Sequence, residues 1–225
     1  MGWRLTADTR AAAPGRRGPP GAGAPGRVAT GGAPAEGRGV RRRVKRVSAS
    51  RRRRCTWATR EPLISYHDVE WGSPLHEDRR LFEFLILEGM QAGLSWETVL
   101  RKRPAFRRAF LRFDPVKVAA FGPRDVARLM RDESIIRNRA KIDAAVGNAK
   151  AVLAVRKEFG SFDAYVWKFD DKDVLSKDLK KRGFRFVGPT IVESFMQAVG
   201  IRNDHERGCY RRAELIRARA VTPAR

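Results

Sequence analysis

The sequence predicts an all-α fold, a compact orthogonal bundle of short helices. Two observations carry this prediction. No stretch of the 225 residues sustains the alternation of apolar and polar residues that is typical of a strand. Apolar residues recur instead at helical spacing, in segments that glycine and proline interrupt at short intervals. Short helices with such breaks favour a bundle over a coiled coil or a repeat array.

Residues 1–54 differ in composition from the rest of the chain. They hold 15 basic and 2 acidic residues, within a chain of net charge +23, and are rich in Gly, Ala, Pro and Arg. Because they contain few large apolar residues, we expect a disordered basic tail. Its arginine clusters, 41–46 and 51–54, can bind phosphate groups, although a solvated tail or a transit peptide has a similar composition.

Residues 55–215 are long enough to form one domain with a core, and 216–225 are expected to form a flexible C-terminal tail. No segment has the 18 or more apolar residues of a membrane span, and no signal-peptide core is present. We therefore expect a cytoplasmic protein without membrane contact.

The first helix of the predicted domain begins at Leu81 in a run of apolar residues, and Gly93 is its expected end. Ser95 is expected to cap a second helix that begins at Trp96. Pro104 is predicted to interrupt this pattern. The caps that follow are Asp114, Gly122, Ser161 and Ser176. In chain order the remaining helices are predicted over 105–112, 115–120, 124–130, 139–159, 162–169, 177–182 and 189–199.

Glu88 is a carboxylate in the middle of the most apolar run of the domain. It is predicted to be buried, at a cost that needs a compensating role. Gly89 and Gly93 remove bulk beside it, so that a flat ligand can approach, and Trp96 lies within reach if the chain folds back. The alternative is a core glutamate that binds a neighbouring backbone amide.

Residues 176–199 have the pattern of a helix-hairpin-helix unit: a basic helix, a glycine-containing turn and an apolar helix. Backbone amides near a glycine at a helix start can face a phosphate, and basic side chains supply charge nearby. The predicted DNA-binding residues are Lys180, Lys181, Arg182, Arg185 and Gly188. An ordinary helical hairpin with a solvated basic face is the alternative.

Cys55, His67, His205 and Cys209 form a possible set of metal ligands. Two thiolates and two imidazoles suit a tetrahedral zinc ion with a structural role, and His205 and Cys209 lie one helical turn apart. Unrelated core residues would have the same spacing, so both interpretations stay open at this point. A disulfide is disfavoured in a reducing cytoplasm.

Separated motifs follow one another in the chain: Cys55-x-Trp57, Tyr66-His67-Asp68-x-Glu70-Trp71-Gly72, Leu81-Phe82-Glu83, Leu87-Glu88-Gly89-x-Gln91-Ala92-Gly93-Leu94-Ser95-Trp96, Phe113-Asp114-Pro115, Ile135-Ile136-Arg137, Lys180-Lys181-Arg182-Gly183-Phe184, Phe186-Val187-Gly188 and Asn203-Asp204-His205. Together they resemble the DNA-3-methyladenine glycosylase I family. The resemblance covers about Cys55 to Cys209. It implies the fold of the helix-hairpin-helix glycosylase superfamily and a structural zinc on the four ligands named above, which joins the N- and C-terminal segments.

The resemblance also implies an activity, the hydrolytic release of 3-methyladenine from damaged double-stranded DNA by base flipping. Glu88 resembles the catalytic carboxylate that recognises the flipped base. The aromatic residues expected to bind the substrate around it are Trp57, Tyr66, Trp71 and Trp96. The chain has Pro189-Thr190 where lyase-active relatives have a lysine, which implies a monofunctional hydrolase. Asp204 lies beside a zinc ligand, so it is not expected to be the catalytic aspartate of other superfamily members.

One departure from the family pattern lies between Cys55 and His67, a segment that is one residue shorter and has Leu63-Ile64 where a tyrosine is expected. One wall of the pocket is therefore expected to differ. The competing hypothesis is a non-catalytic, zinc-stabilised DNA-binding module. Such a module has no use for Glu88 among aromatic residues. For either function we expect a monomer.

Overall fold

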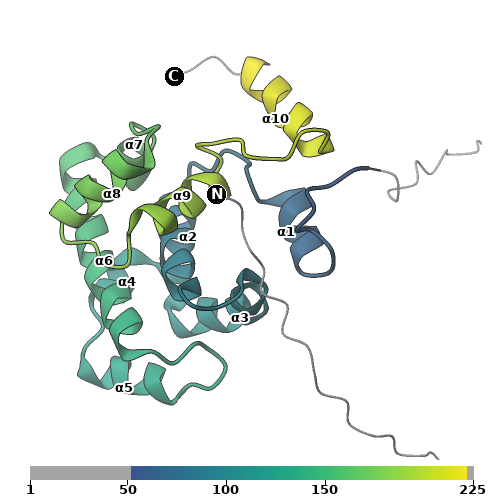
Figure 1. Cartoon of the computed structure of the whole chain (residues 1–225). Helices are drawn as coiled ribbons and strands as arrows, with labels where there is room; N and C mark the ends of the chain where they lie inside the picture. Colours follow the sequence, from purple (N-terminus) through teal and green to yellow (C-terminus); the bar gives the residue numbers. More distant parts are fainter. Residues whose placement is uncertain (1–51, 222–225) are drawn as a thin grey trace, which may run out of the picture. The chain divides into compact units, whose positions relative to one another are not determined.

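The computed structural model describes residues 52–221, which fold into ten α-helices and one 3-10 helix (Figure 1). Their bounds are α1 Leu63–Val69, α2 Asp78–Gln91, α3 Trp96–Ala109, η2 Leu111–Phe113, α4 Pro115–Ala119, α5 Pro123–Arg131, α6 Arg139–Phe159, α7 Phe162–Val166, α8 Lys172–Lys181, α9 Pro189–Ala198 and α10 Tyr210–Val221. No strand occurs within 52–221, so the all-α prediction is confirmed for the described part of the chain. The basic tail predicted over 1–54 lies outside this part except for its last three residues.

Several predicted helix ends agree with the structure. The Ser95 hydroxyl accepts a hydrogen bond from the backbone N–H of Thr98 and caps α3. The Asp114 carboxylate caps α4 in the same way, with Pro115 in the first turn. Helix α6 has the bounds that the sequence predicts and ends at Gly160. Local cap chemistry therefore determines these boundaries.

Two predicted boundaries are wrong. Pro104 lies inside α3, which continues because the residues around it, such as Val99 and Phe106, are fully buried and offset one missing backbone hydrogen bond. Ser176 does not cap a helix. Helix α8 begins earlier, at the cap residue Asp171, and the Ser176 hydroxyl donates instead to the backbone carbonyl of Val187 at 2.7 Å.

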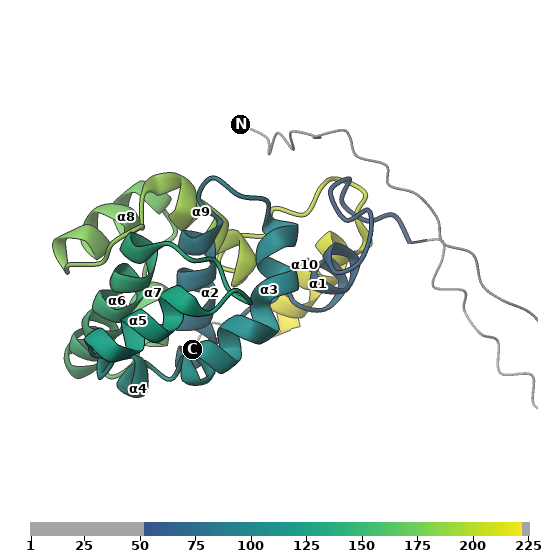
Figure 2. The ribbon, with the colours of Figure 1, turned by 90° about the horizontal axis from the view of Figure 1, so that it is seen from below.

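Helix α2 is the central helix of the domain (Figure 2). Every residue from Leu81 to Met90 is buried, because α2 contacts α3, α6, α7 and α9 on different sides. Helices α8 and α9 pack together as the predicted hairpin, and α9 lies against α2. Helix α10 extends beyond residue 215, to Val221. Helices from the two ends of the described chain, α1 and α10, lie on the same side of α2 (Figures 1 and 2). None of the described helices combines the length and apolar composition needed to cross a membrane.

Candidate metal centre and base-binding site

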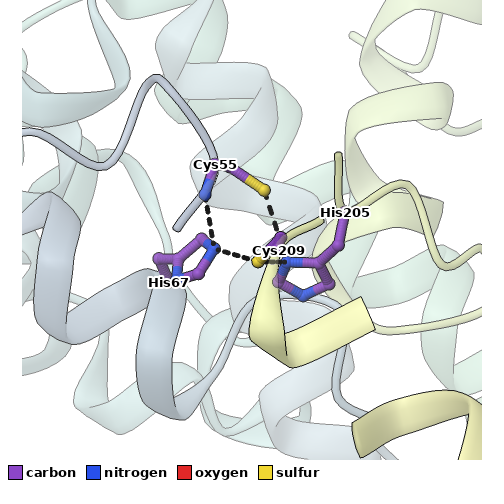
Figure 3. Close-up of side chains that lie close together, drawn as sticks. All are labelled: Cys55, His67, His205 and Cys209. Carbon is purple, nitrogen blue, oxygen red and sulfur yellow. Dashed lines mark hydrogen bonds between the residues drawn. The ribbon is translucent and has the colours of Figure 1, made fainter. Parts of the chain in front are cut away.

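Four buried side chains converge where the two ends of the described chain meet (Figure 3). Cys55 precedes α1, His67 lies in α1, and His205 and Cys209 precede α10. Their ligand atoms all lie within 4.8 Å of one another. The Cys209 Sγ atom lies 3.3 Å from His67 Nε2 and 3.5 Å from His205 Nδ1. Thus the structure brings together all four predicted ligands, and the cluster can bind a metal ion.

The outer nitrogen of each imidazole is held by an acceptor. His67 Nδ1 lies 2.8 Å from an oxygen of Asp68, and His205 Nε2 lies 3.1 Å from the backbone oxygen of Trp71. Because a carboxylate and a carbonyl only accept, these outer nitrogens carry the protons and the inner nitrogens offer lone pairs to a metal. Arg54 binds Asp68 through Nε at 2.8 Å, and this hydrogen bond lowers the pKa of Asp68.

Burial controls the protonation of the cluster. It lowers the pKa of His205 to about 4 and also lowers that of His67, so both imidazoles are neutral, as metal ligands must be. Burial raises the pKa of the Cys55 thiol to about 12. A divalent cation would displace such a thiol proton. Gly72 is required beside the cluster, because its φ is +76° and an added Cβ would lie 2.9 Å from His205 Nε2.

A buried ion network holds the segment after α1 against α2 and α3. The Arg103 guanidinium donates to both oxygens of Glu70, at 2.9 and 3.0 Å, and through Nε to Glu83 at 2.5 Å. Arg80 and Arg107 complete the pairing of these two glutamates. The network fixes the residue next to Trp71, and so links the central helix to the metal cluster.

Glu88 lies in the middle of α2 and is 2% exposed. Its Oε2 atom is buried and has no hydrogen-bond partner among the described residues. Burial raises the pKa of Glu88 to about 8. By contrast, the other buried glutamate of the same helix, Glu83, is bound by two arginines. Glu88 therefore lacks the partner that a structural role requires, and a ligand with donors and positive charge would provide one.

This pKa predicts a pH dependence of stability for Glu88→Gln. The native state keeps a proton that the unfolded state, with a pKa near 4.5, has lost. Raising the pH from about 5 to about 8 therefore destabilises the wild type at this residue, and the change levels off above the native pKa. Glu88→Gln removes this effect. We expect the variant to gain about 2–4 kcal/mol relative to the wild type over this window. Denaturant unfolding of both proteins at pH 5, 6.5 and 8 measures the difference, and a difference that does not change with pH contradicts it.

Aromatic side chains extend from the metal cluster toward Glu88. The rings of Tyr66 and Trp96 have centroids 5.4 Å apart, and those of Trp57 and Tyr66 are 6.2 Å apart. Burial, then the charge of Glu88, raises the pKa of Tyr66, so the phenol lies within electrostatic range of this carboxyl group. Trp71 lies at the metal end, with its ring 4.5 Å from that of His205. Trp57, Tyr66 and Trp96 thus form a row of aromatic rings, in which Tyr66 is the residue that senses the charge of Glu88.

Between Cys55 and His67 the chain has one tyrosine, Tyr66, and Leu63-Ile64 stand where a further tyrosine was expected. Leu63 is buried in the core, and Ile64 is half-buried. Both side chains are aliphatic.

In the hairpin, Gly188 is the N-cap of α9 and Pro189 occupies its first turn. Lys180, Lys181 and Arg185 are exposed. Their charge is available to phosphate groups near this helix start.

Arg182, also predicted to bind DNA, forms ion pairs within the protein. It donates to Asp178 through Nε and to Glu158 through Nη1, each at 2.6 Å. Its guanidinium lies over the rings of Phe159 and Tyr165. The contacts of Arg182 join the hairpin to α6 and α7.

Sequence patterns gave no indication of two buried polar residues on α6, Lys141 and Asn148, which contact the segments that carry the site. The one feature that could have drawn attention to them is their spacing, because residues seven apart project from the same face of a helix.

The sequence pattern of the methyladenine glycosylase family matches residues 57–175 and 170–212. DNA-3-methyladenine glycosylase 1 of Escherichia coli K12 is 49% identical, over 69% of this chain and 95% of its own length. The Haemophilus influenzae DNA-3-methyladenine glycosylase is 43% identical, over 69% and 96%.

Solved structures agree with these matches. A crystal structure of 3-methyladenine DNA glycosylase I superposes with a TM-score of 0.68 at 47% identity, over 70% of this chain and 98% of that one. The enzyme from Staphylococcus aureus, in a structure that describes 3-methyladenine recognition, gives a TM-score of 0.67 at 36% identity, over 70% and 95%. The resemblance noted in the sequence motifs is confirmed, and this chain belongs to the DNA-3-methyladenine glycosylase I family.

Proposed function

We propose that this protein is a DNA repair enzyme that hydrolyses the N-glycosidic bond of 3-methyladenine in alkylated double-stranded DNA. The observation that carries the proposal is Glu88, a buried carboxyl group without a protein partner, next to an aromatic row. Relatives at 43–49% identity are named for this activity, and one solved relative contains bound 3-methyladenine.

The chemistry of the damaged base suits this site. Adenine methylated at N3 is cationic within DNA and is already a good leaving group, so the enzyme chiefly has to extrude it and hold its charge. The rings of Tyr66 and Trp96 can stack on a cation. A cation beside Glu88 favours the ionised carboxylate, which can then accept hydrogen bonds from the exocyclic amine. Neutral adenine presents the same amine without the charge, so the site favours the damaged base.

The hairpin would hold the DNA while the base is extruded. Backbone N–H groups at the start of α9 and the side chains of Lys180, Lys181 and Arg185 suit phosphate groups of one strand. These contacts carry no sequence information, as a repair enzyme requires. Without a lysine at Pro189-Thr190, the proposed reaction is hydrolysis alone, with water as the nucleophile.

Zinc is the proposed metal of the four-residue cluster. Tetrahedral zinc, with bonds of about 2.3 Å to sulfur and 2.0–2.1 Å to nitrogen, places sulfur and nitrogen ligands about 3.5 Å apart. Three of the four sulfur–nitrogen distances are 3.3, 3.5 and 3.5 Å and fit this geometry. With all four positions taken by protein, the proposed role is structural. We also propose that the protein acts as a monomer.

The deciding experiment is a base-release assay with the purified protein on methylated duplex DNA. We expect free 3-methyladenine and intact abasic strands without strand cleavage. Duplex binding without base release would support the alternative, a non-catalytic DNA-binding module, whereas strand cleavage at the abasic site would contradict the hydrolytic mechanism.

Deleting residues 1–50 should leave the melting temperature unchanged, because the composition of this segment predicts no packed structure. The rate of single-turnover excision should stay within about two-fold of that of the full chain. Binding to undamaged duplex should weaken, and its dependence on salt should become less steep, because basic residues of this segment release counterions from DNA. Titrations at two salt concentrations measure the change. A truncated protein that does not fold would show that this segment belongs to the domain.

A further inference from the structure

Helix α6 carries two buried polar side chains on one face. Lys141 is 8% exposed and Asn148 is 3% exposed. They lie seven residues apart, two turns of the helix, and so project in nearly the same direction. Their buried neighbours on α6 include Ile142 and Val152. Burying an ammonium and an amide in such surroundings is costly unless both are hydrogen-bonded.

Lys141 binds the end of the central helix. Its Nζ atom donates to the backbone carbonyls of Met90, at 2.8 Å, and Ala92, at 2.7 Å. A cation also interacts favourably with the C-terminal end of a helix. The two carbonyls lie between Glu88 and Trp96 in the chain, so Lys141 fixes the turn that joins the base-binding residues.

Asn148 binds the hairpin turn. Its side-chain amide donates to the backbone carbonyl of Arg185 at 3.0 Å, and its oxygen accepts from the backbone N–H of the same residue at 2.8 Å. Two residues further on, the Ser176 hydroxyl holds the carbonyl of Val187. The phosphate-facing turn is thus attached both to α6 and to its own first helix.

The two attached segments also touch each other directly. A Cβ atom added at Gly89 would lie 3.4 Å from the Cβ of Phe186, so the hairpin turn rests on α2 at the residue after Glu88. A pocket between these segments is lined by Lys141 and Asn148 as well as by Gly89 and Phe186. Helix α6 therefore spans the back of the contact between the base site and the hairpin.

We propose that Lys141 and Asn148 are positioning residues, through which α6 sets the distance between the base-binding carboxylate and the phosphate-binding hairpin. The inference rests on the proposed function. Phosphate contacts fix the position of the duplex. The extruded base must then reach Glu88 across the distance that separates this carboxyl group from the hairpin. Since errors of about 1 Å in such positioning can cost about 100-fold in rate, two fixed attachments to one rigid helix serve the reaction.

The test uses Asn148→Ala and Lys141→Met in the full chain, with Val152→Ala on the same helix as the matched control for lost packing. Three quantities are measured for each protein: binding of free 3-methyladenine, binding of undamaged duplex, and single-turnover excision at saturating enzyme. Free base needs only the base site, undamaged duplex needs only the hairpin, and excision needs both at the right distance. We expect each binding constant to stay within about three-fold and excision to fall about ten-fold or more in both variants.

The control separates positioning from stability. Val152→Ala should lower the melting temperature while its folded fraction excises at the wild-type rate. Lys141→Arg should recover most of the excision, because its guanidinium also donates to carbonyls. Wild-type excision by Asn148→Ala and Lys141→Met would overturn the inference, as would parallel losses in all three quantities. A wild-type protein that binds duplex and free base but releases no 3-methyladenine would overturn the proposed function, and the inference with it.

Discussion

Glu88→Gln is expected to lower single-turnover excision of 3-methyladenine by about ten-fold or more, which corresponds to about 1.4 kcal/mol or more in activation free energy. The amide keeps the shape of the side chain but cannot stabilise a cationic base by charge. Binding to undamaged duplex should stay nearly constant, because it depends on the hairpin and its basic residues. The melting temperature should be unchanged or higher, because near neutral pH the carboxyl group of Glu88 ionises in the unfolded state and so favours it, whereas glutamine has no such preference.

Glu83→Gln is the matched control, because it changes a second buried glutamate of the same helix. Glu83 accepts from Arg103 and Arg107, so Glu83→Gln leaves the buried guanidinium of Arg103 with Glu70 as its one carboxylate partner. This change should destabilise the protein by about 1–3 kcal/mol. Its folded fraction should excise at nearly the wild-type rate. The opposite result, a normal excision rate and a much lower melting temperature for Glu88→Gln, would show that the role of Glu88 is structural.

Cys209→Ala is expected to lower the free energy of unfolding by about 4 kcal/mol or more, a loss typical of removing a metal site. For a domain of this size the melting temperature should fall by about 10 °C or more. Metal analysis of the wild type should give one equivalent of zinc, and a chelator should reproduce the destabilisation of the variant without adding to it.

Leu215→Ala is the control for packing near the metal cluster, because Leu215 is a buried residue of α10 that lies close to Gly72 and His205. It should lower stability but keep its zinc, so a chelator should destabilise it further. A wild-type protein that carries well under one equivalent of zinc, together with an unchanged melting temperature for Cys209→Ala, would disprove the metal assignment.

The small number of cysteines and histidines made the candidate metal ligands predictable from the sequence. Cys55 and Cys209 are the only two cysteines in the chain, and with two of its three histidines they leave few possible metal ligand sets. Glu88 stood out because a charged residue in a continuous apolar run has few structural explanations. Helix ends such as Ser95 and Gly160 were predictable because a cap acts through neighbours in the chain.

Contacts between distant segments could not be read from local patterns. Lys141 and Asn148 resemble solvent-facing residues of a helix until the segments 51 and 37 residues away are placed against them. The same limit applies to Arg182, whose partner Glu158 lies 24 residues earlier. Helix α1 has only seven residues, too few for a helical spacing of apolar residues to stand out, and its buried residues, including Tyr66, are covered by side chains from elsewhere in the domain.

The ligands of the metal cluster come from opposite ends of the described chain, with Cys55 and His205 150 residues apart. During synthesis the first pair of ligands leaves the ribosome long before the second, so the cluster cannot be completed until residue 209 has emerged. Closing so long a loop costs entropy that only the folded helices between the ends can reduce. Retention of the proposed zinc would therefore report that the whole domain has been made and folded. A chain cut short before His205 would keep the proposed base-binding residues and the hairpin, yet lack half of the proposed zinc ligands.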